Sequence, residues 1–241
     1  MTYLSLIIPA YNEESCLEKN SETVLAYLDA LDRDYELIFV DDGSRDSTPS
    51  IIERIVKNNP QCRSLSNPTN RGKGNAVRRG VLAATGKYVI FVDADLAVPI
   101  GFVAACLSSL EAMTPVVIGS RHLPSSSFKV REGPLRQVCG EVYRRFARLS
   151  LGLRVSDITC GLKGFEREAA TDIFSRSKID RWGYDVEIIF LAHKLKYVIE
   201  EVPVDWYHSF DSKVSVGIDA IRTFTEMCRV CYYYISKGYE V

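Results

Sequence analysis

The stretch YVIFVDAD, residues 88–95, is an unbroken apolar run that ends in two acids. Two runs of the same kind come earlier, LIIPA at 6–10 and LIFV at 37–40. All three are apolar almost throughout instead of alternating, which is typical of strands buried on both faces of a parallel sheet. The carboxyl ends of such strands meet at one edge of the sheet, where ligands bind. Polar residues follow each run, and we expect one site to contain Asn12, Glu13, Asp41, Asp42, Asp93 and Asp95.

Helical patterns separate and follow these strands. The windows with apolar residues at helical spacing are 16–31, 47–59, 72–85, 135–152 and 185–195. Two further strands are expected at 115–120 and 197–207. Strands interleaved with helices form βαβ units with right-handed crossovers. The sequence therefore predicts an α/β fold, with a Rossmann-like, mostly parallel central sheet flanked by helices, and no domain boundary within residues 1–241.

Composition narrows the class of protein. The formal net charge of -1 over 241 residues gives no indication of a nucleic-acid partner. The seven cysteines form no regular framework, and Cys228 and Cys231 read as ordinary residues of a helix more readily than as a metal or redox site. Free cysteines fit a reducing cytoplasm. The opening residues carry no basic leader, and no segment approaches the roughly 18 apolar residues of a membrane span. We expect a soluble or peripheral protein.

The acids Asp93 and Asp95 are spaced to act together on one hard cation. Mg²⁺ and Mn²⁺ prefer oxygen ligands, and in proteins they often bridge carboxylates to substrate phosphates. A solvated turn, or an Asp that caps the next segment, is the alternative. The position of the pair at the end of a buried strand favours the metal.

Two other motifs indicate a nucleotide. In VDDGSRDST, residues 40–48, capping explains Asp46 well but explains the doublet Asp41–Asp42 poorly, and a carboxylate at a strand end can accept the uracil imide N–H or bind ribose. In NRGKGNAVRRG, residues 70–80, glycines accompany Arg71 and Lys73, which can neutralise phosphate. The spacing matches neither a P-loop nor a dinucleotide-binding GxGxxG. An ordinary nucleoside triphosphatase or dehydrogenase is therefore disfavoured.

Taken in order, IIPAYNEE, VDDGSRDST, NRGKGNAVRRG, VDADL and GSR resemble the inverting glycosyltransferases of family 2, which have the GT-A fold. The later stretches DITCGLKGF, RWGYDVEIIFLA, EVPVDWYH and DSKV resemble the dolichyl-phosphate glucosyltransferases and the related mannose synthases. The resemblance spans residues 5–214. It implies a nucleotide-sugar-binding half at 1–121, an acceptor half at 122–214 and a C-terminal amphipathic helix at 215–241.

The resemblance also implies the substrates and their ligands. A hexose would move from UDP-glucose, or next in preference GDP-mannose, to a polyprenyl or dolichyl phosphate, with Mg²⁺ or Mn²⁺ as cofactor. Asp93 and Asp95 would carry the metal, Arg121 would face a substrate phosphate, and Lys213 would stabilise the leaving group. The implied nucleotide-binding residues are Pro9, Ala10, Tyr11, Glu13, Asp41, Asp42, Lys73, Asp93 and Ala94.

The acceptor decides what else the site must contain. A hydroxyl acceptor needs a general base, whereas a phosphate is already ionised and needs cationic guidance instead. Arg121, Arg131 and Arg136 would supply that guidance, since arginine suits bidentate phosphate binding. Asp157 could orient an arginine, or serve as base in an enzyme with a hydroxyl acceptor. Transfer to a hydroxyl acceptor is therefore the alternative, and a non-catalytic nucleotide-sugar-binding protein is the remote one.

The C-terminal segment leaves two alternatives open. Arg222, Arg229 and Lys237 lie beside a tyrosine-rich cluster in an amphipathic pattern. Such a helix could lie in a bilayer interface or pack as a terminal helix. With a lipid acceptor, we expect the protein at the cytoplasmic face of a membrane.

Overall fold

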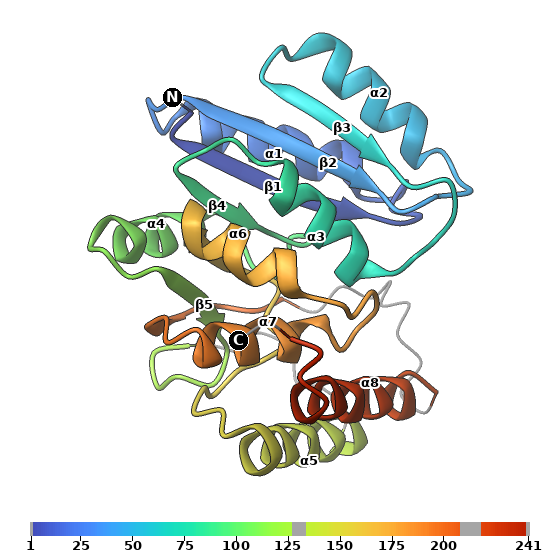
Figure 1. The fold of residues 1–241 in the computed structure, drawn as a ribbon. Helices are drawn as coiled ribbons and strands as arrows, with labels where there is room; N and C mark the ends of the chain where they lie inside the picture. Colours follow the sequence, from blue (N-terminus) through green and yellow to red (C-terminus); the bar gives the residue numbers. More distant parts are fainter. Residues whose placement is uncertain (1, 127–133, 208–217, 240–241) are drawn as a thin grey trace.

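The protein is built around one seven-stranded sheet. In the computed structural model, which describes residues 2–126, 134–207 and 218–239, the strand order is β3-β2-β1-β4-β6-β5-β7 (Figure 1). The strands are β1 (Leu4–Ala10), β2 (Tyr35–Asp41), β3 (Cys62–Ser66), β4 (Tyr88–Phe91), β5 (Val116–Ser120), β6 (Lys163–Glu166) and β7 (Ile199–Pro203). All neighbouring pairs are parallel except those of β6, which runs antiparallel to β4 and β5. The predicted mostly parallel sheet is confirmed.

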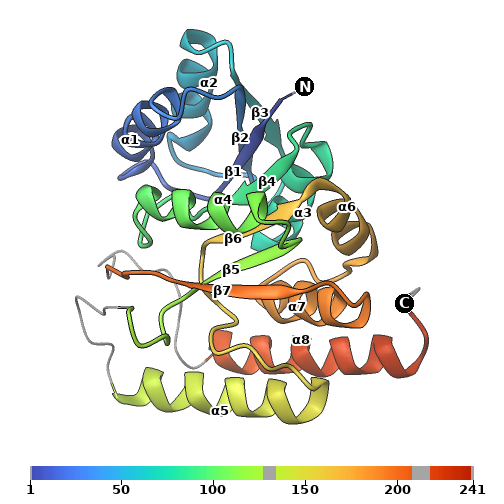
Figure 2. The same ribbon diagram turned by 90° about the vertical axis from the view of Figure 1, so that its left-hand side faces the viewer.

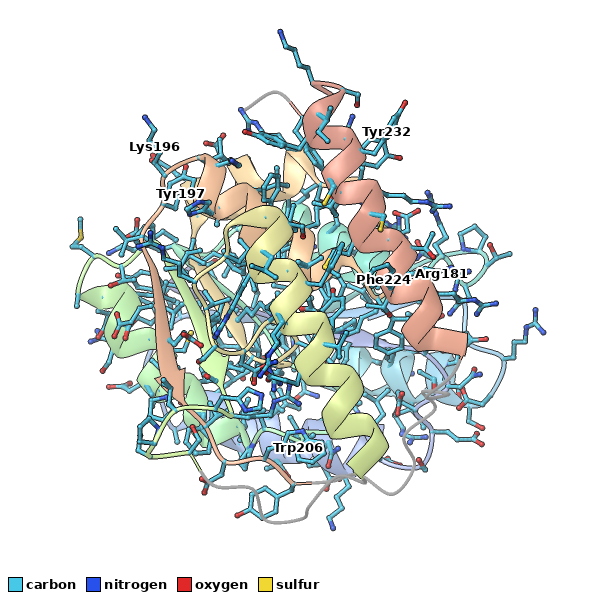
Figure 3. All side chains as sticks on the ribbon, turned by 90° about the horizontal axis from the view of Figure 1, so that it is seen from below. Arg181, Lys196, Tyr197, Trp206, Phe224 and Tyr232 are labelled. Carbon is cyan, nitrogen blue, oxygen red and sulfur yellow. The ribbon has the colours of Figure 1, made fainter. Side chains whose placement is uncertain are left out.

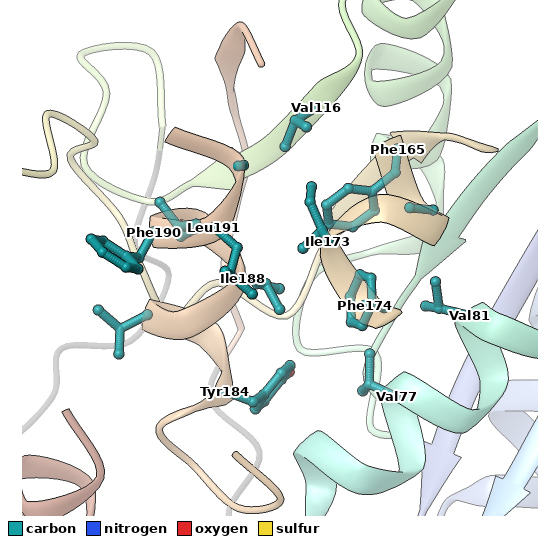
Figure 4. Close-up of a cluster of buried hydrophobic side chains, with 14 of the residues drawn as sticks. Val77, Val81, Val116, Phe165, Ile173, Phe174, Tyr184, Ile188, Phe190 and Leu191 are labelled. Carbon is teal, nitrogen blue, oxygen red and sulfur yellow. The ribbon is translucent and has the colours of Figure 1, made fainter. Parts of the chain in front are cut away.

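Helices cover both faces of the sheet, as Figure 2 shows. The helices are α1 (Leu17–Asp29), α2 (Thr48–Asn58), α3 (Lys73–Ala83), α4 (Val103–Glu111), α5 (Pro134–Leu151), α6 (Arg167–Arg176), α7 (Tyr184–Lys194) and α8 (Ile218–Ile235). One buried cluster joins the sheet to α1, α2 and α4, and the other joins it to α3, α6 and α7 (Figure 4). Within β1, Leu6 and Ile8 belong to the first cluster and Ile7 to the second. This alternation explains why the strand is apolar at every position.

Strand β6 is the element that the sequence did not predict. Its four residues, Lys163–Glu166, contain a lysine, a glycine and a glutamate, and they form no apolar run. The strand pairs Lys163 with Phe91 of β4 and with Ile118 of β5. This pairing brings the residues just before β6 beside the end of β4, where Asp93 follows.

Helices α5 and α8 lie side by side as an outer layer beyond α7, on the face seen in Figure 3. The rings of Phe146 and Phe224 join them, with centroids 4.7 Å apart. Among the described residues, no helix is long and apolar enough to cross a membrane.

Candidate active site

The loops after β1 and β2 are bonded to each other at the carboxyl edge of the sheet. The backbone N–H of Asn12 donates to Ser44 Oγ at 2.9 Å, and the Asn12 side chain accepts from the backbone N–H of Arg45 at 2.8 Å. Asn12 adopts a left-handed backbone with φ 54°, a conformation that asparagine tolerates well. The N–H of Glu13 donates to Thr48 Oγ1 at 2.8 Å. These bonds hold the predicted nucleotide-binding residues Pro9, Ala10, Tyr11 and Glu13 against the loop that follows Asp41.

The adjacent acids Asp41 and Asp42 have different surroundings. The Asp42 carboxylate accepts the backbone N–H groups of Arg71, at 2.9 Å, and Gly72, at 2.7 Å, and the amide of Asn67 at 2.6 Å. It therefore shapes the turn that leads into α3. Asp41 accepts the backbone N–H of its own turn and lines an open groove of about 500 Å³ between α2 and β3. The sequence did not distinguish the two acids.

A tight turn after β4 presents Asp93, Ala94 and Asp95. The N–H of Leu96, at φ 49°, donates to the Asp93 carbonyl at 3.1 Å, and the N–H of Ala97 donates to Asp95 Oδ1 at 3.1 Å. From α1, the Asn20 amide donates to the Ala94 carbonyl at 2.8 Å. Asn20 thus fixes the turn that carries both acids, and nothing in its helical sequence context indicates this role.

Asp93 lies between a lysine and a glycine. Lys73, the first residue of α3, places its Nζ 2.5 Å from Asp93 Oδ1. On the other side, a Cβ at Gly161 would lie 2.6 Å from Asp93 Cγ and still closer to Oδ2. Only glycine fits there, because real Cβ atoms do not approach other atoms that closely. The sequence placed Gly161 within a family motif but gave it no role.

The charges around this pair are strongly coupled. Burial alone would lower the pKa of Lys73, but Asp93, Asp185 and Asp95 raise it above its ordinary value. Burial, together with the Asp93 charge, raises the pKa of Asp95. Asp185 pairs with the fully buried Lys163, whose Nζ lies 2.5 Å from its Oδ1. Burial also raises the pKa of Asp185, against the opposing effect of Lys163.

A second cation is held by an acid at the end of β5. Arg121 donates to Asp157 through its backbone N–H at 3.0 Å, through Nε at 2.7 Å and through Nη2 at 2.9 Å. Asp157 is 1 % exposed, and although burial acts to raise its pKa, Arg121 lowers that pKa to about 2. The Arg121 guanidinium lies 5.8 Å from the centre of the Trp206 ring, and Lys73 stands equally far from that of Trp182. Both tryptophans of the chain therefore border a site cation.

The remaining predicted cations are placed as follows. Arg131 and Lys213 lie outside the described residues, and the side chain of Arg136, in α5, lies outside them too. Arg144, which the sequence left between a phosphate ligand and a solvated basic face, contacts His122 Nε2 at 2.7 Å and Glu141 at 2.7 Å. Its neighbour Arg145 pairs with the same Glu141.

The donor set suits a cation that a substrate helps to hold. Within residues 2–126, 134–207 and 218–239, no group of three or more His, Cys, Asp or Glu side chains could enclose a metal. Mg²⁺ and Mn²⁺ are commonly bound by one or two carboxylates together with substrate phosphates. Asp93 and Asp95 at the open end of β4 fit that pattern.

Comparison with known proteins gives three similar relatives, each named dolichyl-phosphate beta-glucosyltransferase. The one from Dictyostelium discoideum is 35% identical and the one from Saccharomyces cerevisiae 31%, each alignment covering 99% of this chain and 77% of the relative. The one from Homo sapiens is 31% identical, over 88% of this chain and 69% of the relative.

Solved structures give the same fold. Glucosyl-3-phosphoglycerate synthase from Mycobacterium tuberculosis, in complex with phosphoglyceric acid, superposes with a TM-score of 0.73 at 20% identity, over 95% of this chain and 80% of that chain. The same enzyme in complex with Mn²⁺, UDP-glucose and phosphoglyceric acid gives a TM-score of 0.71 at 21% identity, with the same coverage. At this identity the likeness establishes the fold alone, and it confirms the predicted GT-A architecture. Residues 5–174 match the family described as glycosyl transferase family 2, and with this match and these relatives the chain belongs to that family.

Proposed function

We propose that this protein transfers glucose from UDP-glucose to dolichyl phosphate or a similar polyprenyl phosphate, with inversion at the anomeric carbon. The names of the relatives support the donor sugar and the lipid phosphate. The observation that carries the choice of acceptor is the state of Asp157, which is fully engaged by Arg121.

The donor would lie along the carboxyl edge of the sheet. The loop at 9–13 and Asp41 would contact the uridine, while Lys73 and the backbone at Ala94 would lie near the phosphates. When bound at Asp93 and Asp95, Mg²⁺ or Mn²⁺ would supply positive charge that stabilises the diphosphate as it leaves. Asn20 and Gly161 hold these acids in place through contacts already described.

The acceptor argument depends on which acids could act as a base. With its carboxyl pKa held at about 2 and both of its oxygens bonded to Arg121, Asp157 is a poor base at neutral pH. Asp185 is buried against Lys163. A phosphate monoester carries most of its charge at pH 7 and needs no base. A site that presents Arg121 while its acids are paired therefore favours a phosphate nucleophile, and Arg131, Arg136 and Lys213 remain predicted partners of the substrates' phosphates.

We further propose that α5 and α8 form a peripheral contact with the cytoplasmic face of a membrane. Leu149 on α5 is 88% exposed, and Tyr232 and Ile235 on α8 are 66% and 80% exposed, while Arg145 on α5 is exposed as well. Apolar and aromatic side chains beside basic ones suit an anionic bilayer interface. A lipid acceptor would be reached from such a position.

The function can be tested with purified protein, a short polyprenyl phosphate and labelled UDP-glucose or GDP-mannose, in the presence of Mn²⁺ or Mg²⁺. We expect label from UDP-glucose to enter the organic phase, and EDTA to stop the transfer. Asp93→Asn with Asp95→Asn should lower the rate roughly 100-fold or more. Asp32→Asn changes an exposed acid that has a left-handed backbone and serves as the control.

Other outcomes would replace parts of the proposal. Transfer from GDP-mannose alone would change the donor. Transfer only to a hydroxyl compound, with a rate that falls as a carboxylate protonates, would change the acceptor class. Nucleotide-sugar binding with no transfer to either acceptor would indicate a binding protein instead.

A further inference from the structure

The contact between Lys73 and Asp93 has a consequence for the proposed metal site, on whose existence this inference rests. Lys73 Nζ lies 2.5 Å from Asp93 Oδ1, and their side chains are 21% and 31% exposed. The ammonium is therefore seated on an oxygen of one of the two acids that would bind the divalent cation.

Asp93 has little freedom to offer another oxygen. Its Oδ2 side faces Gly161 so closely that no Cβ fits between them. The Ala94 carbonyl, in the next residue, is held by Asn20 at 2.8 Å, which restrains the backbone of the turn. A cation that approaches Asp93 from the open site must therefore take the oxygen side where Lys73 is bound.

Lys73 cannot leave this position without losing a favourable partner. The nearby acid Asp185 is already paired with Lys163 at 2.5 Å. The ring of Trp182, with its centre 5.8 Å from Nζ, offers a weaker cation–π contact. A nucleoside diphosphate in the site would provide a new anionic partner for the ammonium. Lysine suits such a shift, because its charge is carried on a flexible four-carbon stem.

We propose that Lys73 competes with the divalent cation for Asp93, and that the diphosphate of the donor relieves this competition by taking over the ammonium. The metal then binds weakly to the protein alone and tightly in the presence of the nucleotide. The acid is kept neutralised before the donor arrives, and the metal site is completed together with the donor site.

The test measures Mn²⁺ binding directly, by the electron paramagnetic resonance signal of free Mn²⁺, with and without UDP. Lys73→Met should bind Mn²⁺ about tenfold more tightly than the unmodified protein when UDP is absent. The gain in Mn²⁺ affinity on adding UDP should be correspondingly smaller in this variant. Lys73→Gln provides a second neutral side chain, and thermal melting checks that each variant is folded.

A matched control separates this effect from the loss of any nearby charge. Arg71 lies two residues before Lys73 and pairs with Asp180 at 3.4 Å, with its own side chain 55% exposed. Arg71→Met should leave the Mn²⁺ affinity measured without UDP unchanged. Equal tightening in Arg71→Met and Lys73→Met would overturn the proposal, and so would unchanged Mn²⁺ affinity in both folded Lys73 variants. If the unmodified protein binds no Mn²⁺ even with UDP, the metal site itself is wrong and both proposals fall.

Discussion

The substitution Gly161→Ala tests whether the position of Asp93 determines activity. The added Cβ would lie 2.6 Å from Asp93 Cγ, whereas ordinary contacts begin at 3.4 Å. The Asp93 carboxylate would therefore have to move by about 1 Å, because Gly161 precedes β6, whose pairing with β4 and β5 restrains the backbone on its side.

The size of the effect follows from that displacement. A misplacement of about 1 Å in a catalytic group can cost about 100-fold in rate, which corresponds to about 2.7 kcal/mol of transition-state stabilisation. Overpacking of a buried position also destabilises a fold, typically by about 1–3 kcal/mol. We expect Gly161→Ala to lower kcat/KM for UDP-glucose about 100-fold, and to weaken Mn²⁺ binding in the presence of UDP.

Transfer assays should be paired with urea unfolding, so that activity and stability are separated. Gly164→Ala, on β6 itself, is the matched control: its Cβ would clash with Cys106 Sγ and come within 3.1 Å of Leu110, away from Asp93. We expect this control to lose stability but to keep kcat/KM close to normal at temperatures where it is folded. The reasoning is refuted if Gly161→Ala retains kcat/KM within about threefold of the unmodified protein, or if both variants lose activity equally.

Three further changes test contacts around the site. Asp157→Asn removes the partner of Arg121. Because the carboxyl pKa of Asp157 is lowered to about 2, from about 3.9 when unfolded, its stabilisation is present above pH ~4 and is lost as the pH falls through ~2. Urea unfolding should therefore show a loss of roughly 3 kcal/mol at pH 7 that shrinks toward pH 2, and a loss independent of pH would contradict this account. Asn20→Ala leaves the Ala94 carbonyl without its amide donor, so we expect a loss of roughly 1 kcal/mol in stability and a tenfold lower kcat/KM, and unchanged kinetics would argue against a positioning role. Glu226→Ala removes a buried acceptor of the backbone N–H that precedes α7, for which we expect a loss of roughly 1–3 kcal/mol; Glu226→Gln should regain most of it, and equal losses would disprove the hydrogen-bond explanation.

The parts of the fold that could be predicted are those with a local signal. The runs at 6–10, 37–40 and 88–92 are apolar because both of their faces are buried, and that property is visible without knowing any partner. Their carboxyl ends share one edge, which is why the acids that follow them could be placed together. The family match confirms the class of enzyme that these motifs indicated.

The parts that could not be predicted depend on partners far away in the chain. Strand β6 contains Lys163, which is fully buried only because Asp185 on α7 neutralises it. A short segment of Lys, Gly, Phe and Glu has no periodicity that indicates a strand. The role of Gly161 is likewise invisible until the antiparallel pairing of β6 with β4 brings it against Asp93.

The doublet Asp41–Asp42 shows how an alternating strand separates neighbours. Phe39 packs in the cluster with α1 and α2, and Val40 in the cluster with α3. Side chains two positions apart share a face, so Asp41 follows Phe39 toward α2 and Asp42 follows Val40 toward α3. Asp42 is therefore placed to receive the N–H groups at the start of α3, and Asp41 is left for the groove beside α2. Register, and not composition, assigns the two acids to different tasks.

The balance of charge in the site explains why it would need a divalent cation. The pairs Lys73–Asp93, Arg121–Asp157 and Lys163–Asp185 each combine one positive and one negative charge, and Asp95 adds a further acid. These seven groups together supply no net positive charge, yet both proposed substrates carry phosphate. The donor diphosphate and the acceptor phosphate would repel each other unless cations are added. We therefore expect the metal at Asp93 and Asp95, with Arg131, Arg136 and Lys213, to bring the positive charge that allows the two substrates to meet.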